Sequence, residues 1–237
     1  MIAALFFLAA ALHPLSEPDN PIVKASKEIR LDSFPCFAYP ISDLDPLFEA
    51  LGKKTVTIFA YGSLLNEKSA AKSLSIQALR TYRPALVFGY SRTFDRHVPK
   101  TKWKKERPGD TGMLNLFENS NGLTNGVIFE ATRKDLHSLL AREQGYDLVP
   151  VVVIPWEYQG KKPQIAYTFI ASSQLRGGIH YTSEKINPVP AYAKLSQKGA
   201  LRFGADYMQF WIDSTYLSDR KTPYAEWLKN PAIDLSQ

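Results

Sequence analysis

Short runs of β-branched and aromatic residues recur from residue 55 to residue 171, and they constrain the fold of this chain more than any other feature. Such runs, when turn residues separate them, are typical of buried strands. Glycine-containing turns are expected at Asn121-Gly122 and at Asn125-Gly126. The strands expected from this pattern cover residues 55–61, 78–82, 85–92, 112–117, 126–130, 149–158 and 164–171.

Helical composition marks segments before, between and after these strands. Thr132, with Asp135 three residues later, predicts a capped helix start, and this helix should end at Gly145. The other segments with helical composition cover residues 44–51, 66–75, 189–217 and 223–230.

The composition indicates one folded domain. The chain has 237 residues, of which 45% are hydrophobic and 22% charged, and these values are ordinary for a globular protein. We expect the domain over residues 55–237, with a helical C-terminal part, after an extended arm over residues 15–54 that is rich in proline, serine and aspartate. Cys36 is the single cysteine, which excludes an internal disulfide framework and a cysteine-rich zinc or iron–sulfur site.

The N-terminal segment, residues 1–14, is apolar. Its first 12 residues carry no charged side chain, and they fall short of the roughly 20 apolar residues that cross a membrane as a helix. Three interpretations stay open, namely an atypical export signal, a surface-lying anchor and an over-extended start. We expect no integral membrane span and favour a cytoplasmic location, with export through this segment as the alternative.

Most of the net positive charge, +4 of +6, comes from one stretch. The chain carries 29 Lys and Arg against 23 Asp and Glu, and residues 96–110 hold six of the former against two of the latter. Nucleic-acid binding, with Trp103 as a stacking residue, is one interpretation. A solvated basic loop is favoured, because no basic helix or second patch extends a binding track. Such a loop could also attract an acidic substrate, and we expect no nucleic-acid partner.

A strand-to-helix turn, Tyr61-Gly62-Ser63-Leu64, carries the first chemical signal. Unpaired backbone N–H groups at such a turn point in one direction and attract a carboxylate or phosphate. Gly62 permits close backbone approach. The alternative is an ordinary helix cap, which many Gly-Ser turns form.

The second signal is Glu143, at the end of a helix and just before a very apolar strand. A carboxylate held there can lose its water, which raises its pKa and makes it a usable proton acceptor near neutral pH. The alternative is a surface residue, or one paired with Arg142 or another cation.

In this order the two signals resemble the γ-glutamylcyclotransferase superfamily, which includes ChaC-type and AIG2-like proteins. The resemblance covers residues 55–153, more weakly to residue 216, and rests on FAYGSLL, LVFGYSRTF, GMLNLF and NGVIFEATRKDLHSLLAREQGYDLVPV. It implies an α+β fold, a small mixed β-barrel of short strands flanked by helices. The implied activity is cyclisation of an L-γ-glutamyl amide, such as glutathione, to 5-oxoproline with release of the amine. A non-catalytic, ligand-binding member of this fold is the alternative.

The resemblance also implies roles for single residues. Glu143 matches the family's catalytic glutamate, and Gly62, Ser63 and Leu64 match the turn whose backbone amides hold the glutamyl group. The remaining implied substrate-binding residues are Tyr61, Arg92, Tyr146 and Tyr192, although core packing or a structural ion pair are alternatives for Tyr146 and Arg92. The family uses no metal and no cofactor, and the four histidines here are dispersed. The expected partner is a small γ-glutamyl substrate, and the sequence indicates no oligomeric state.

Overall fold

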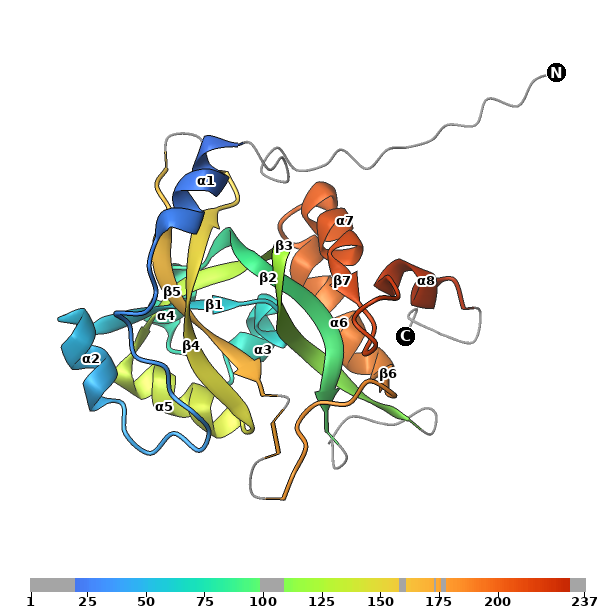
Figure 1. The fold of residues 1–237 in the computed structure, drawn as a ribbon, viewed down its shortest axis with the longest axis horizontal. Coiled ribbons are helices and arrows are strands. Elements are labelled where there is room, and N and C mark those ends of the chain that lie inside the picture. The colour runs from blue at the N-terminus through green and yellow to red at the C-terminus, as the bar shows by residue number, and fades with distance from the viewer. Residues whose placement is uncertain (1–19, 99–108, 158–160, 173, 176–177, 231–237) are drawn as a thin grey trace.

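The computed structural model describes residues 20–98, 109–157, 161–172, 174–175 and 178–230. The apolar segment at residues 1–14 and most of the basic stretch lie outside these ranges. The helices, in chain order, are α1 (Pro21–Glu28), α2 (Asp45–Leu51), the short 3₁₀ helix η2 (Ser63–Leu65), α3 (Glu67–Ala70), α4 (Ile76–Arg80), α5 (Arg133–Arg142), α6 (Pro190–Leu201), α7 (Ala205–Asp213) and α8 (Tyr224–Leu228) (Figure 1). The strands are β1 (Thr55–Ala60), β2 (Arg83–His97), β3 (Asp110–Thr132), β4 (Tyr146–Pro155), β5 (Gln164–Ala171), β6 (Asn187–Pro188) and β7 (Thr215–Tyr216).

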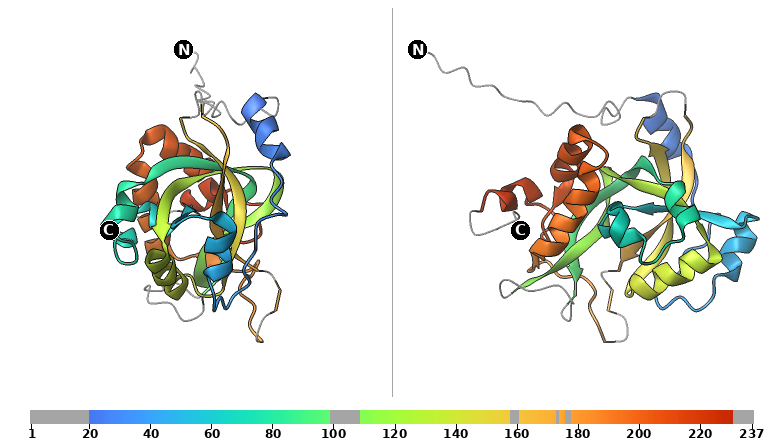
Figure 2. Two further views of the ribbon diagram at one scale, coloured as in Figure 1. Left: turned by 90° about the vertical axis from the view of Figure 1, so that its left-hand side faces the viewer. Right: turned by 180° about the vertical axis from the view of Figure 1, so that it is seen from behind.

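The strands form one sheet that closes into a barrel. Their order is β6-β3-β1-β5-β4-β2-β7, and the additional pairing of β3 with β2 joins the sheet back on itself. Pairing is mixed, since β1 runs antiparallel to β3 and parallel to β5. The left view of Figure 2 shows these strands curving round, with helices outside them. The predicted α+β class, a small mixed barrel flanked by helices, is confirmed.

The expected Asn-Gly turns are wrong. Strand β3 extends from Asp110 to Thr132. Gly126 pairs with Ala85 of β2, and Asn121-Gly122 lies in a bulge of β3, residues 119–122, opposite Gly89. A Cβ at Gly122 would lie 2.5 Å from the carbonyl carbon of Tyr90, and one at Gly126 would lie 2.5 Å from the carbonyl oxygen of Ala60. These glycines therefore allow neighbouring backbones to approach closely within the sheet. Close backbone approach explains a glycine in a strand without any turn.

Other local predictions are mostly confirmed. The expected strand at residues 78–82 is wrong, because Ser75 caps helix α4 there by accepting a hydrogen bond from the amide of Ala78. Helices α2, α3 and α5 and the C-terminal helices form where composition predicts them, whereas α1 was not anticipated. Among the described residues, no helix is long and apolar enough to cross a membrane.

The segment between α1 and α2 packs against the barrel. Phe37 forms an isolated antiparallel bridge with Leu148 of β4, and the amide of Tyr39 donates a hydrogen bond to the Asp147 carboxylate at 2.8 Å. This edge of β4 is open at that point, because β2 pairs with β4 only through residues 85–87. The segment after α1 thus covers a strand edge before reaching α2 (Figure 1).

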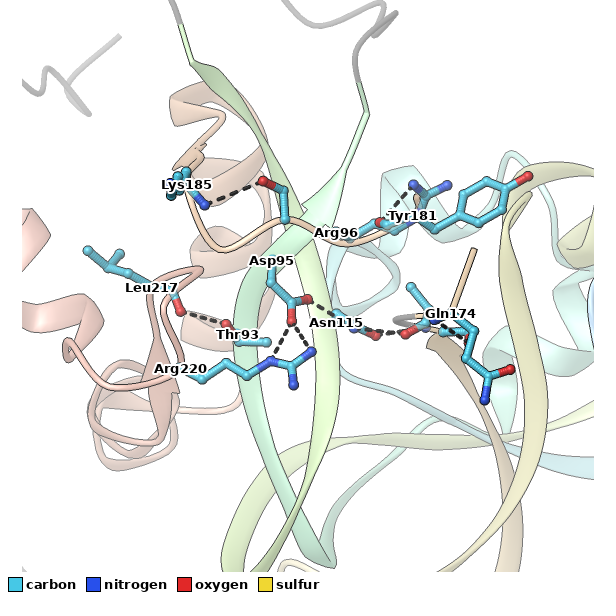
Figure 3. A network of polar contacts seen from close by, with 12 residues as sticks. Thr93, Asp95, Arg96, Asn115, Gln174, Tyr181, Lys185, Leu217 and Arg220 are labelled. Atoms are coloured by element: carbon cyan, nitrogen blue, oxygen red, sulfur yellow. Dashed lines mark hydrogen bonds and ion pairs between the residues drawn. The ribbon is translucent and has the colours of Figure 1, made fainter. Parts of the chain in front are cut away.

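A side chain closes the barrel where backbone pairing stops. The Asn115 amide accepts a hydrogen bond from the amide of Ala171 at 2.8 Å and donates one to its carbonyl at 3.2 Å, joining β3 to the end of β5. It also donates to the carboxylate of Asp95, which is only 1% exposed and forms an ion pair with Arg220 at 2.7 Å (Figure 3).

The capping box at the start of α5 is confirmed, and it reaches further than the sequence predicts. The Asp135 carboxylate accepts hydrogen bonds from the amide and hydroxyl of Thr132 and from the amide and hydroxyl of Ser75, at 2.6–3.1 Å. One buried carboxylate therefore fixes the starts of both α5 and α4.

Replacing Asp135 by Ala should lower the free energy of unfolding by about 1–3 kcal/mol, because donors buried at two helix starts lose their acceptor. Burial opposes ionisation, yet the hydrogen bonds from Thr132 and Ser75 hold the pKa of Asp135 below its usual value. Its stabilisation is therefore full above the unfolded pKa of about 3.9 and is lost as pH falls through the folded pKa. Urea unfolding at pH 7 and pH 3 tests this, and an equal loss at both pH values would contradict it.

Candidate active site

A pocket lies where β1 ends and the Tyr61–Leu64 turn begins. It encloses ≈ 330 Å³ of space outside the protein atoms, including open solvent at its mouth. It brings together seven of the eight residues that the sequence singles out, since only Arg92 is missing. The lining residues are Phe59, Ala60, Tyr61, Gly62, Ser63, Leu64, Leu114, Glu143, Tyr146, Phe169 and Tyr192.

The turn forms a tight wall of this pocket. After Gly62 the chain enters η2, and the amide of Leu65 donates back to the carbonyl of Gly62 at 2.9 Å. A Cβ at Gly62 would lie 2.7 Å from the Tyr192 hydroxyl, so only glycine leaves room for this phenol. The Tyr192 oxygen forms backbone hydrogen bonds with Ser63 and Leu114. An oxygen atom therefore already sits against the amides of the turn.

Glu143 faces the same pocket from the end of α5. It is the C-cap residue, and its amide donates to the carbonyl of Leu139 at 2.7 Å. Its side chain is 18% exposed, and burial raises its pKa, while the charges of Arg142 and Arg96 lower it. The ion pair that the sequence left as an alternative is present, with Arg142 Nε 3.3 Å from Glu143 Oε1. A pocket carboxylate can thus be partly desolvated and ion-paired at once.

Arg142 connects the glutamate to the turn. Its guanidinium donates to the Ser63 hydroxyl at 2.7 Å, to the Ser69 carbonyl at 2.8 Å and to the Ser69 hydroxyl at 2.9 Å. The same side chain therefore fixes Ser63, α3 and Glu143 relative to one another. The sequence suggested Arg142 only as a counter-ion, because Ser63 and Ser69 lie far from it along the chain.

Three tyrosines complete the polar lining. The Tyr61 hydroxyl donates to the Phe169 carbonyl at 2.5 Å, and the Tyr146 hydroxyl donates to the Leu114 carbonyl at 2.8 Å. Burial raises the pKa of both phenols well above the usual value, and it raises the pKa of Tyr192 to about 12. These phenols stay neutral near pH 7, which leaves Glu143 as the lining side chain suited to accept a proton there.

Arg92 does not reach the pocket, which corrects the expectation that it binds a substrate carboxylate. Its side chain is fully buried, and its guanidinium donates to the carbonyls of Tyr61, Asn125 and Trp211. The alternative, a structural role, describes Arg92 better than substrate binding does. Its partners within the described residues are carbonyl, amide and hydroxyl oxygens and not the carboxylate of an ion pair. Arg92 supports the turn from behind through the carbonyl of Tyr61.

Several lining residues were missed by the sequence analysis. Phe59, Ala60, Leu114 and Phe169 are apolar strand residues, and nothing in their local pattern separates pocket from core. Asn187, which lies close to Tyr192 in the sequence, pairs with Asp110 through β6 and does not line the pocket. Within the described ranges, no three His, Cys, Asp or Glu side chains gather as a metal site requires.

Replacing Gly62 by Ala should lower activity by about 10²-fold, because the new methyl group displaces the Tyr192 hydroxyl and shifts the turn. The Tyr192→Phe protein lacks this hydroxyl, so in that background Gly62→Ala should lower activity less than it does in the wild type. Steady-state kinetics of the four proteins test this as a double-mutant cycle. Strict additivity of the two substitutions would contradict the contact.

Comparison with known proteins gives one family and one fold. A family model described as ChaC-like protein matches residues 56–210. The chain is similar to a solved structure described as gamma-glutamyl cyclotransferase, with 20% identity and a TM-score of 0.51, over 66% of this chain and 86% of that one. It is also similar to YkqA from Bacillus subtilis, with 20% identity and a TM-score of 0.51, over 68% of this chain and 54% of that one. No curated protein matches the sequence.

Proposed function

Since this chain belongs to the ChaC-like protein family, we propose that it is an enzyme that cyclises an L-γ-glutamyl amide to 5-oxoproline and releases the amine. The observation that carries this proposal is that Glu143 and the Gly62–Leu64 turn line one pocket. A proton acceptor and a set of backbone donors therefore face the same small space, as this reaction requires.

In the proposed reaction, the substrate's own α-nitrogen is the nucleophile. Glu143 takes a proton from the α-ammonium group, and the free amine attacks the γ-carbonyl carbon. The new C–N bond closes a five-membered ring, and the bond from the same carbon to the leaving nitrogen breaks. Two protons leave the α-nitrogen and the leaving nitrogen takes them up, with Glu143 as carrier, so no water is consumed. Because attack is intramolecular, the pocket mainly folds the substrate and moves protons.

The turn is suited to hold the glutamyl group. Backbone amides at a helix start stabilise a carboxylate or a developing oxyanion. The backbone hydrogen bond between Ser63 and the Tyr192 oxygen supports this role, because an amide of the turn already holds an oxygen atom. The neutral phenols of Tyr61 and Tyr146 shape the floor without adding a competing charge.

The direct test is to incubate the purified full chain with glutathione, γ-glutamyl dipeptides and a γ-glutamyl amine, and to measure 5-oxoproline. We expect product with at least one of these substrates, at a rate that a metal chelator leaves unchanged. If none gives product while a γ-glutamyl compound still binds by calorimetry, the protein is a ligand-binding member of the fold, and the catalytic proposal fails.

A further inference from the structure

Arg96 is the first residue of the basic stretch, yet it is 7% exposed and lies inside the protein. It projects from β2 between the start of β4 and a segment that pairs with β2 through an isolated bridge from Arg96 to Thr182. Among the described residues, no carboxylate lies within 4 Å of its guanidinium. Its charge is thus held by carbonyls and aromatic rings.

On one side, Arg96 contacts the residues that follow Glu143 in direct succession. Its Nη2 atom donates to the carbonyl of Gln144 at 2.7 Å, and its guanidinium lies 5.1 Å from the centre of the Tyr146 ring. Gly145 lies between them with a left-handed φ of 82°, and a Cβ there would lie 2.6 Å from Nη2. The loop after the glutamate is therefore shaped around this guanidinium.

On the other side, Tyr181 holds Arg96, and Tyr39, which lies between α1 and α2, packs against Tyr181. The Arg96 Nη1 atom donates to the carbonyl of Tyr181 at 3.3 Å (Figure 3), and the Arg96 guanidinium lies 4.8 Å from the centre of the Tyr181 ring. The Tyr39 ring packs edge-on against Tyr181, with centroids 5.8 Å apart. Tyr39 is itself anchored to Asp147 through its amide. A continuous set of contacts thus joins the segment between α1 and α2 to the glutamate loop.

We infer that Arg96 is a positioning residue for Glu143, because it clamps the loop that directly follows the glutamate. This inference rests on the proposed function, because it assigns Arg96 a part in preparing the proton acceptor. Arg142 pairs directly with the Glu143 carboxylate, and its hydrogen bonds go to Ser63 and Ser69. Arg96 makes none of those contacts among the described residues, so its charge and its clamp act on the glutamate loop.

The pH dependence follows from the groups that face Glu143. These are Arg142 on α5, Arg96 on β2, Tyr146 on β4, Tyr192 on α6 and Tyr61 after β1. Burial raises the pKa of Glu143, while Arg142 and then Arg96 lower it, and the phenols stay neutral. Removing the charge of Arg96 should therefore raise the pKa of Glu143, so that activity is lost at a higher pH as the solution is acidified.

The experiment compares kcat/KM against pH for wild type, Arg96→Gln, Arg96→Lys and Tyr181→Leu. Arg96→Gln should move the acid limb upward by roughly 1 pH unit and lower the rate at its optimum. Arg96→Lys keeps the charge and should leave the limb in place while kcat falls, because a lysine cannot bridge Gln144 and Tyr181. Tyr181→Leu should lower kcat without moving the limb. Arg133→Gln removes the same charge from an exposed site and should change neither quantity.

The possible outcomes distinguish a failure of the proposed function from a failure of the inference about Arg96. If wild type forms no 5-oxoproline, the proposed function fails. If wild type is active and Arg96→Gln keeps its acid limb and its kcat, the inference about Arg96 fails. Should Arg96→Gln not fold, as judged by thermal unfolding, Arg96→Lys still decides, because a wild-type kcat in that variant would overturn the clamp.

Discussion

Replacing Glu143 by Gln should lower the rate of 5-oxoproline formation by about 10²–10⁴-fold, the usual cost of removing a general base. The amide keeps the shape of the carboxylate and can still accept a hydrogen bond from Arg142, so the pocket keeps its form. The loss should fall on kcat, with KM changed little, because the turn and the tyrosines still bind substrate. Single-turnover and steady-state measurements of 5-oxoproline check this.

The same variant carries an internal control for folding. Because the pKa of Glu143 is raised in the folded state, the stability linked to its protonated form is present below the unfolded pKa and is lost as pH rises through the folded pKa. At pH 7 the glutamine should therefore be no less stable than the glutamate. Glu143→Gln with wild-type activity would sink the proposed mechanism, and an unfolded Glu143→Gln would show that the ion pair with Arg142 is structural first.

Replacing Arg92 by Leu should lower the free energy of unfolding by about 3–5 kcal/mol, because several buried acceptors lose their donor together. The Arg92 guanidinium spans β3 and the C-terminal helices, and it lies 4.5 Å from the centre of the Trp211 ring. Its acceptors are Tyr61 O, Asn125 O, Asn125 Oδ1, Trp211 O, Ser214 Oγ and Thr215 Oγ1, at 2.7–3.2 Å.

The matched control is Arg83→Leu, which removes an exposed arginine from the same strand and should stay within about 0.5 kcal/mol of wild type. Arg92→Lys should fall between the two, because one ammonium group cannot satisfy so many acceptors. Chemical denaturation of the three variants gives the comparison. A stable Arg92→Leu protein with only a raised KM would restore the role of Arg92 as a substrate-binding residue.

Local sequence signals predicted the structure correctly where that structure depends on neighbouring residues. The capping box at Thr132 and Asp135, the strand that ends just before the Tyr61–Leu64 turn and the helix that has Glu143 as its C-cap each depend on neighbours within a few residues. The two motif segments meet because β1 and α5 flank the same strand, β3, and the resemblance of their order to a known family supplied that link.

Predictions failed where distant backbone decides the local choice. Gly122 and Gly126 look like turn residues, but Tyr90 and Ala60 press against them across the sheet. No window of sequence contains both members of these contacts. The pairing of such distant segments is a tertiary effect that outweighs turn propensity.

Arg96 was misplaced for a related reason. The charge count assigned it to a basic loop because basic residues follow it in the chain. It is instead still part of β2, where Tyr146 and Tyr181 enclose it. A count of charges along the chain identifies a basic stretch, but it does not identify the residue at which β2 ends within that stretch.

The bridge between Phe37 and Leu148 means that the folding unit begins earlier than the motifs do. The family match starts at residue 56, and a protein trimmed to that boundary would leave part of β4 with unsatisfied backbone groups and no cover. Bare strand edges recruit other strands, so self-association would follow. The residues ahead of the first motif therefore protect this edge of β4.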